Sequence, residues 1–231
     1  MEKFISFLID VVDKNYHQKK IFKFLDNLNI KIIFDIGAHK REFLKSIKQL
    51  KKFNKIYAFE PQKKIYNKLQ LLNEDNKIIC LNLAISDNSG IKNLKINKKS
   101  STSTFSEIDT SSKWYKMKSL LLGGNIKTSF LAQEEVNTNT LDDFCLKNKI
   151  ENIDLLKIDT EGHEKEVLQG ASSLLLNKKI KYILIEFHLS KMYQNYSTGY
   201  LEEFLAKSNF LLLKKFKFPF LSFEDRIYKL L

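Results

Sequence analysis

Residues 31–37 read KIIFDIG, residues 55–61 read KIYAFEP, and the helical pattern REFLKSIKQL lies between them. Strand, helix and strand in this order are typical of a parallel sheet with crossover helices. Several apolar runs are continuous rather than alternating, as expected of strands that are covered on both faces. The sequence therefore predicts an α/β fold of the Rossmann-like, doubly wound type, with a mostly parallel seven-stranded sheet. The other strand candidates are at 77–85, 153–159, 181–188, 210–218 and 226–231.

The last two strand candidates predict an antiparallel hairpin. Only residues 219–225, PFLSFED, separate them, which is too short for a helical crossover, so we expect them to pair at the edge of the sheet. Helical patterns separate the other strands, and in one of them Thr140 precedes LDDF and is expected to cap the helix. The remaining helical patterns are at 63–72, 163–176 and 199–210.

The chain is predicted to form a single domain. Two prolines and seven glycines leave no obvious flexible linker, so we expect one domain over residues 31–231 and a helical segment, residues 1–30, that packs on it. Residues 91–136 interrupt the alternation of predicted strands and helices and are interpreted as an insertion. They hold a predicted extra hairpin at IKNLKI, a polar SSTSTF run and a pair of glycines at 123 and 124. Insertions of this kind often form lids or acceptor pockets.

The charge balance raises the question of a nucleic-acid partner. The formal charge is +12 and the isoelectric point is about 9.4. Only Arg41 and Arg226 are arginines, however, and the lysines are spread over the whole chain. A dedicated nucleic-acid binder would use more of the planar guanidinium groups that read bases and clamp phosphates. We therefore disfavour a nucleic-acid partner and attribute the charge to biased residue usage.

The first residues, MEKFISFLIDVV, indicate where in the cell the protein is expected to be. They are too short and too charged to span a membrane, and they lack the cleavage site of a signal peptide. We expect a cytoplasmic protein with at most a weak membrane-surface contact. Cys80 and Cys145 lie in apolar segments without zinc-site spacing and are expected to be reduced core residues. No heptad pattern predicts an oligomeric state.

Acidic residues mark the ends of the first two predicted strands. Asp35 is followed by Gly37, which lets the backbone approach a ligand closely. Glu60 lies 25 residues past Asp35, where a carboxylate can accept hydrogen bonds from ribose hydroxyls. The G-x-G-x-x-G turn that seats a pyrophosphate is absent, so a cofactor without phosphates fits better than NAD or FAD. The pattern indicates S-adenosylmethionine.

Further ionisable residues follow the predicted strand at 153–159 and the one at 181–188. Asp159 and Glu161 come after the first of these strands, and Glu186 ends the second. Histidine can remove a hydroxyl proton near neutral pH, and carboxylates beside it can orient the ring or hold a divalent cation. A cation at Asp159, Glu161 and Glu186 stays an alternative, which we disfavour, and no metal is predicted. The histidines that follow predicted strand ends are His39, His163 and His188.

Together these segments resemble the FkbM-type methyltransferases, a branch of the class I S-adenosylmethionine-dependent enzymes. The resemblance covers residues 32–188. Members of that family are mostly O-methyltransferases that act on sugars or natural-product hydroxyls, and many occur beside bacterial genes for polysaccharide biosynthesis. The segments that carry it are FDIGAHKREF, YAFEP, NLAISDNSG, VNTNTLDDF, IDLLKIDTEGHEKEVLQGA and ILIEFH.

The resemblance also implies roles for particular residues. Asp35, Gly37, Ala38 and His39 would line the methionine part of the cofactor, Glu60 with the adjacent Pro61 would meet the ribose, and the turn from Asn82 to Ala84 would meet the adenine. Asp159, Glu161 and His188 would face the methyl acceptor. One departure concerns the first motif, which in the family continues to a second glycine as D-x-G-A-x-x-G. This chain has Arg41 at that position.

The predicted function is an O-methyltransferase that acts on a hydroxyl of a sugar, glycan or natural-product acceptor. His188 is the preferred general base, and Asp159 is the second choice. Two alternatives remain open. The lysine excess is compatible with a nucleic-acid methyltransferase, and Arg41 is compatible with a non-catalytic interaction module that retains the fold.

Overall fold

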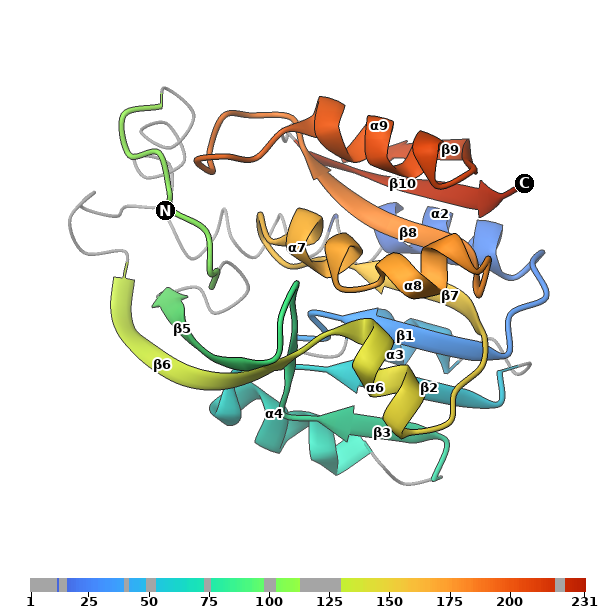
Figure 1. Ribbon diagram of the computed structural model, residues 1–231, viewed down its shortest axis with the longest axis horizontal. Coiled ribbons are helices and arrows are strands. Elements are labelled where there is room, and N and C mark those ends of the chain that lie inside the picture. The colour runs from blue at the N-terminus through green and yellow to red at the C-terminus, as the bar shows by residue number, and fades with distance from the viewer. Residues whose placement is uncertain are drawn as a thin grey trace.

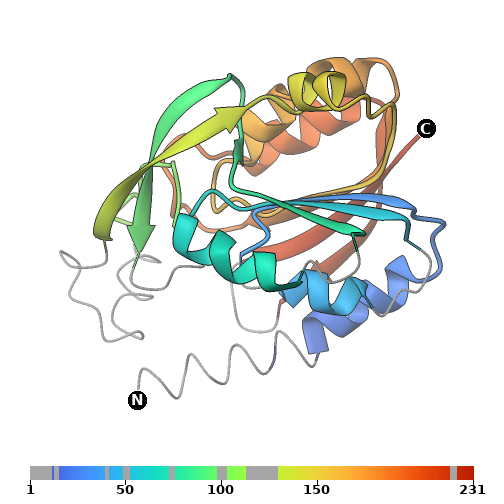
Figure 2. The same cartoon turned by 90° about the horizontal axis from the view of Figure 1, so that it is seen from below.

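The computed structural model describes residues 12, 16–39, 42–48, 53–72, 76–97, 103–112, 130–218 and 223–231. Within these ranges the chain forms a seven-stranded sheet with helices on both faces, and a curved three-stranded sheet beside one end of it (Figures 1 and 2). Arg41, the glycines at 123 and 124, and residues 1–11 of the predicted N-terminal segment lie outside the described residues.

The central sheet confirms the predicted fold class. Its strand order is β3-β2-β1-β7-β8-β10-β9, and β10 runs antiparallel to both of its neighbours while the other pairs are parallel. The antiparallel C-terminal hairpin is present, with β9 as the edge and β10 inserted between β8 and β9. The strands are β1 (Ile32–Ile36), β2 (Lys55–Phe59), β3 (Ile78–Leu81), β7 (Ile153–Ile158), β8 (Ile180–His188), β9 (Phe210–Lys217) and β10 (Phe223–Leu230).

The apolar core lies on both faces of this sheet, as its continuous apolar strands predict. Helices α2 (Gln18–Leu25), α3 (Glu42–Ile47) and α4 (Lys63–Leu69, followed by a short 3-10 turn at Gln70–Leu72) contribute to the core on one face. Helices α6 (Leu141–Lys147), α7 (Glu164–Gln169), α8 (Ser172–Leu176) and α9 (Thr198–Lys207) cover the other. Thr140 caps α6 as expected, because its hydroxyl accepts a hydrogen bond of 3.0 Å from the Asp143 amide.

The pattern predicted as one helix at 163–176 is two short helices, α7 and α8. Gly170 separates them, and a Cβ on this residue would lie 2.0 Å from the Ser86 carbonyl oxygen. The break therefore brings the backbone of the helical layer into direct contact with the turn that follows strand β4.

The insertion differs from the hairpin predicted at IKNLKI. Strand β5 (Gly90–Asn97) pairs antiparallel with β6 (Phe130–Asn139), a strand that was not predicted, and β6 also pairs parallel with the short β4 (Ala84–Ile85). The pairing partners are separated by more than thirty residues along the chain, whereas hairpin prediction considers only neighbours in sequence. The resulting three-stranded sheet stands at the carboxyl ends of β1 and β2 (Figure 1).

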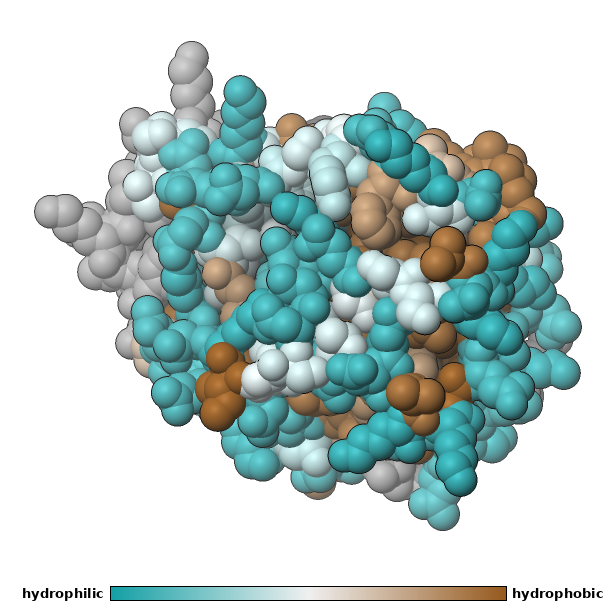
Figure 3. All heavy atoms as spheres, in the orientation of Figure 1, coloured by the Kyte–Doolittle hydropathy of each residue, from teal (hydrophilic) through white to brown (hydrophobic). Residues whose placement is uncertain are grey.

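Helix α2 of the predicted N-terminal segment packs against the sheet, and its Ile21 and Leu25 are buried in the core. Within the described ranges, no helix combines the length and apolar character needed to cross a membrane. Hydrophilic residues spread across the face seen in Figure 3, and apolar residues gather over the edge strand β9 near the end of the chain. Leu211, Leu212 and Leu213 are exposed there.

Candidate active site

A first pocket, the cofactor pocket, opens at the carboxyl ends of β1, β2 and β7. It holds about 530 Å³ of empty space, and the three-stranded sheet supplies part of its wall. Among the described residues, four of the predicted site residues do not line it, namely Asp35, Ala38, Asn82 and His188. Those that do line it are Gly37, His39, Glu60, Pro61, Ala84, Asp159 and Glu161.

Gly37 forms the turn that opens the pocket. Its φ is +85°, and a Cβ would lie 1.9 Å from the Asp159 carbonyl oxygen. The amides of Gly37 and Ala38 both donate to the Phe59 carbonyl, at 3.1 and 3.0 Å. Only glycine therefore satisfies both the backbone conformation and the close contact between the ends of β1 and β7.

Glu60 is buried in the wall of this pocket at the end of β2. Its carboxylate accepts hydrogen bonds from the amides of His39, at 3.0 Å, and Gln62, at 2.8 Å. Burial raises the pKa of Glu60 to about 7, although these two amide donors oppose the shift. A carboxylate has about four acceptor positions. Two of them are thus left for a ligand, as the ribose role requires.

The raised pKa of Glu60 predicts a pH-dependent cofactor affinity. Ionised Glu60 is the better acceptor for ribose hydroxyls, and a group with a pKa of about 7 becomes roughly tenfold more ionised between pH 6 and pH 8. We expect the affinity for S-adenosylhomocysteine to rise by up to that factor over this range, measured by calorimetric titration. Glu60→Gln is the control and should flatten the profile; an unchanged profile in this variant would assign the titration to another group.

The side of the pocket at which the sequence predicts the adenine is apolar. Ala84 and Phe105 line it together with Leu94. Asn82 stabilises the loop after β2 instead of facing the pocket. Its side-chain amide donates hydrogen bonds to the carbonyls of Glu60 and Pro61, at 3.1 and 2.7 Å.

A buried lysine that sequence reasoning missed connects two of the predicted acids. The Lys157 ammonium lies 3.1 Å from the Asp35 carboxylate and 3.2 Å from that of Asp159. Burial alone would lower the pKa of Lys157, but Asp159 and Asp35 raise it above its ordinary value. Lys157 is therefore a permanent cation, and Asp35 holds it in place. A lone lysine within an apolar strand was the signal, because a buried charge needs a partner.

A second pocket also has Asp159 in its lining. It encloses about 410 Å³, open solvent included, between helices α2 and α3 and strands β7, β8 and β10. Asp159 lines both pockets, and its side chain is 38% exposed. The two pockets thus share this residue.

Glu161, Glu186 and His188 form a cluster near this point. One ligand atom from each lies within 4.8 Å of the others, an arrangement that could hold a metal ion. The His188 ring lies 3.3 Å from the Glu186 carboxylate and packs edge-on against Tyr193. Tyr193 also donates a hydrogen bond to Glu161. His188 is 6% exposed and, among the described residues, lines neither pocket.

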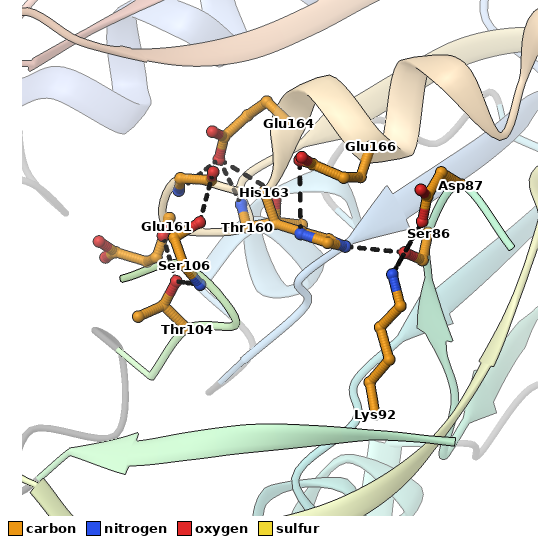
Figure 4. A network of polar contacts seen from close by, with 11 residues as sticks. Ser86, Asp87, Lys92, Thr104, Ser106, Thr160, Glu161, His163, Glu164 and Glu166 are labelled. Carbon is orange, nitrogen blue, oxygen red and sulfur yellow. Dashed lines mark hydrogen bonds and ion pairs between the residues drawn. The ribbon is translucent and has the colours of Figure 1, made fainter. Parts of the chain in front are cut away.

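His163 belongs to a polar network beside the cofactor pocket (Figure 4). Its Nε2 lies 2.9 Å from the Ser86 hydroxyl, to which the Lys92 ammonium also donates, at 2.7 Å. Burial, assisted by Lys92, lowers the pKa of His163 to about 4, so the ring is neutral at physiological pH. His163 thus joins the loop after β7 to the three-stranded sheet.

The insertion contacts the loop that carries Glu161. Thr104 donates to the Glu161 carbonyl at 2.6 Å, and Ser106 donates to the Gly162 carbonyl at 2.7 Å (Figure 4). Glu161 has a positive φ of 53°, which these contacts help to maintain. Of these two donors only Thr104 belongs to the polar SSTSTF run, and residues 100–102 of that run lie outside the described residues.

The fold and this carboxyl edge define the chain as a class I methyltransferase. A family model described as the methyltransferase FkbM domain matches residues 35–212, and the chain belongs to that family. This result confirms the resemblance stated above, and S-adenosylmethionine is the cofactor of this class. Among curated protein sequences, none matches the chain.

Solved structures are similar to the chain in fold. An FkbM methyltransferase from Methylobacillus flagellatus superposes with a TM-score of 0.55 at 15% identity over 87% of this chain, which spans 43% of that protein. TrmK of M. capricolum, in complex with S-adenosylhomocysteine, gives 0.51 at 16% identity, with 93% of this chain and 68% of that one covered. The methyltransferase domain of bacterial CtHen1-C gives 0.52 at 8% identity, covering 94% and 98%.

Proposed function

We propose that this protein transfers the methyl group of S-adenosylmethionine to a hydroxyl of a sugar, glycan or natural-product acceptor. The observation that carries the proposal is the position of Asp159, a residue that lines both pockets. A ligand in each pocket would meet at this side chain. A carboxylate there can receive the proton that a hydroxyl loses when it is methylated.

The residues of the first pocket fit the cofactor. Glu60 keeps acceptor positions for the ribose, Ala84 and Phe105 offer an apolar surface to the adenine, and Gly37 allows the close approach of the methionine part. When bound, the cofactor supplies an activated methyl group on a positively charged sulfur. The carboxylates of Asp159 and Glu161 place negative charge on the same wall.

Asp159 is our candidate for the general base. Lys157 holds it by an ion pair of 3.2 Å, which restricts the movement of the carboxylate. Positioning of the reacting groups contributes about 7–11 kcal/mol in well-oriented reactions. His188 contacts Glu186 and belongs to the cluster with Glu161, so we assign it a positioning role rather than the base role favoured by the sequence pattern.

The first test is thermal stability with and without ligand. Excess S-adenosylhomocysteine should raise the melting temperature, because a ligand at a hundredfold excess over its Kd stabilises the folded state by about 2.7 kcal/mol. Glu60→Ala should abolish the shift, whereas Glu203→Gln, a fully exposed carboxylate on α9, should retain it. No shift in the wild type, together with a shift in Arg41→Gly, would favour the non-catalytic alternative.

The nucleic-acid alternative makes a different prediction. It is motivated by the lysine excess and requires RNA or DNA binding that weakens steeply as salt increases. The acidic groups around the second pocket, Asp159, Glu186 and Asp225, argue against a phosphate-rich acceptor there. Salt-dependent binding of RNA by the loaded enzyme would reverse this preference.

A further inference from the structure

The second pocket is built by alternate residues of three adjacent strands. Strand β7 contributes Lys157, the residue after it is Asp159, β8 contributes Leu184 and Glu186, and β10 contributes Phe223 and Asp225. In each strand these residues are two positions apart, so their side chains point to the same face of the sheet. That face is the one packed against α2 and α3, from which Ile21 and Phe43 complete the walls.

The pocket adjoins the cofactor pocket at Asp159. A molecule seated in it would therefore lie next to the wall at which the cofactor pocket ends. Phe43 and Phe223 offer apolar surface to the carbon-bound hydrogens of a sugar ring, and the carboxylates offer acceptors to its polar groups.

The charge around the pocket is unbalanced. Glu186 and Asp225 are direct partners in the antiparallel β8–β10 register, and like charges in that position destabilise a sheet. Among the lining residues that the structure describes, Lys157 is the permanent cation, and it is already shared between Asp35 and Asp159. His17 bonds Asp225 at 2.6 Å but is charged only when protonated.

Glu186 is part of this imbalance, because Asp225 lies directly opposite it in the β8–β10 register. The Glu186 carboxylate lies 3.3 Å from the His188 ring, which like His17 is cationic only in its protonated form. A ligand that carries its own positive charge would therefore stabilise the acidic lining.

We infer that the second pocket is the acceptor subsite and that it takes an amino-bearing sugar unit, with the ammonium group between Glu186 and Asp225. The inference rests on the proposed function and specifies its substrate class. The amine anchors the sugar and is not itself methylated. A hydroxyl of the same unit then lies toward Asp159, the carboxylate shared with the cofactor pocket.

The test is a binding comparison with two probes that differ in charge. Glucosamine and its neutral analogue N-acetylglucosamine are titrated by calorimetry at pH 7.5 into protein saturated with S-adenosylhomocysteine. Glucosamine should bind about tenfold more tightly than the neutral sugar, equivalent to about 1.4 kcal/mol. This preference should disappear in Glu186→Gln and in Asp225→Asn, and remain in the exposed control Glu203→Gln.

Both variants are expected to fold normally, so that a lost preference can be attributed to the pocket. Glu186→Gln removes one member of the like-charged pair, so its melting temperature should be equal to or above that of the wild type. Asp225→Asn keeps a side-chain oxygen as the partner of His17. Loss of the preference in both variants, with melting temperatures preserved, supports the acceptor subsite.

Other outcomes overturn the inference. Equal affinity for the two sugars, or binding of neither, removes the amino requirement. Binding of Mn²⁺ that Glu186→Gln abolishes and that glucosamine does not displace would assign Glu186 to a metal site with Glu161 and His188 instead. In each case the S-adenosylhomocysteine titration is read separately, so that failure to bind it counts against the proposed function, and failure of the sugars alone counts only against this inference.

Discussion

Replacing Gly37 by alanine is expected to abolish measurable binding of S-adenosylhomocysteine and to lower the melting temperature by several degrees. The new Cβ would lie 1.9 Å from the Asp159 carbonyl oxygen, so β1 and β7 would have to separate at the edge that holds both pockets. The φ of +85° adds about 1–2 kcal/mol of strain for any residue with a Cβ. Calorimetric titration and thermal unfolding measure the two effects.

Gly199→Ala is the matched control for this substitution. Gly199 lies in the first turn of α9, and the nearest atom to an added Cβ is the Ser197 hydroxyl at 3.8 Å. Alanine is favoured over glycine within a helix by up to about 1 kcal/mol, so this variant should bind the ligand normally and be no less stable. Wild-type affinity in Gly37→Ala would show that the contact with Asp159 does not shape the pocket.

Asp159→Asn should reduce methyl transfer by about 100-fold to 10,000-fold, the usual contribution of a general base. Binding of S-adenosylhomocysteine should change only slightly, because asparagine keeps the size of the side chain and loses its charge and basicity. The measurement is transfer of a radiolabelled methyl group to any glycan that the wild type methylates, with the ligand titration in parallel.

Two comparisons make the result for Asp159 specific. Asp154→Asn changes an acid in the same strand whose carboxylate accepts from the amides of Lys31 and Ile32, at the opposite end of the sheet, and should leave turnover unchanged. His188→Ala should lower turnover less than Asp159→Asn does. The reverse order would return the base role to His188.

The strand ends were the predictable part of the site. Continuous apolar runs identified the central strands, and the parallel order then brought Glu60 and Asp159 to one edge of the sheet. The same reasoning did not show that Asp35 is buried against Lys157, because an acid at a strand end can face either the ligand or the interior. That choice depends on what the neighbouring strand contributes.

The other features of the site depend on contacts between segments that are distant in the sequence, and these could not be predicted. Asp225 was included in the predicted turn PFLSFED, whereas it lies within β10, opposite Glu186. Nothing in the local pattern indicates that β10 enters between two other strands, so the second pocket could not be derived. The place of His188 depends similarly on Tyr193 and Tyr196, which pack against its ring from the following loop.

The hydrogen bonds from Thr104 and Ser106 have a consequence for how such enzymes diversify. Both end on backbone carbonyls, so they constrain two hydroxyl groups in the insertion and no particular side chain in the loop that they hold. Side chains of the insertion that do not line the cofactor pocket can therefore change in evolution while the loop after β7 keeps its conformation. A protein engineer could use the same tolerance to vary the insertion, provided that Ser103 and Phe105, which line the pocket, are kept.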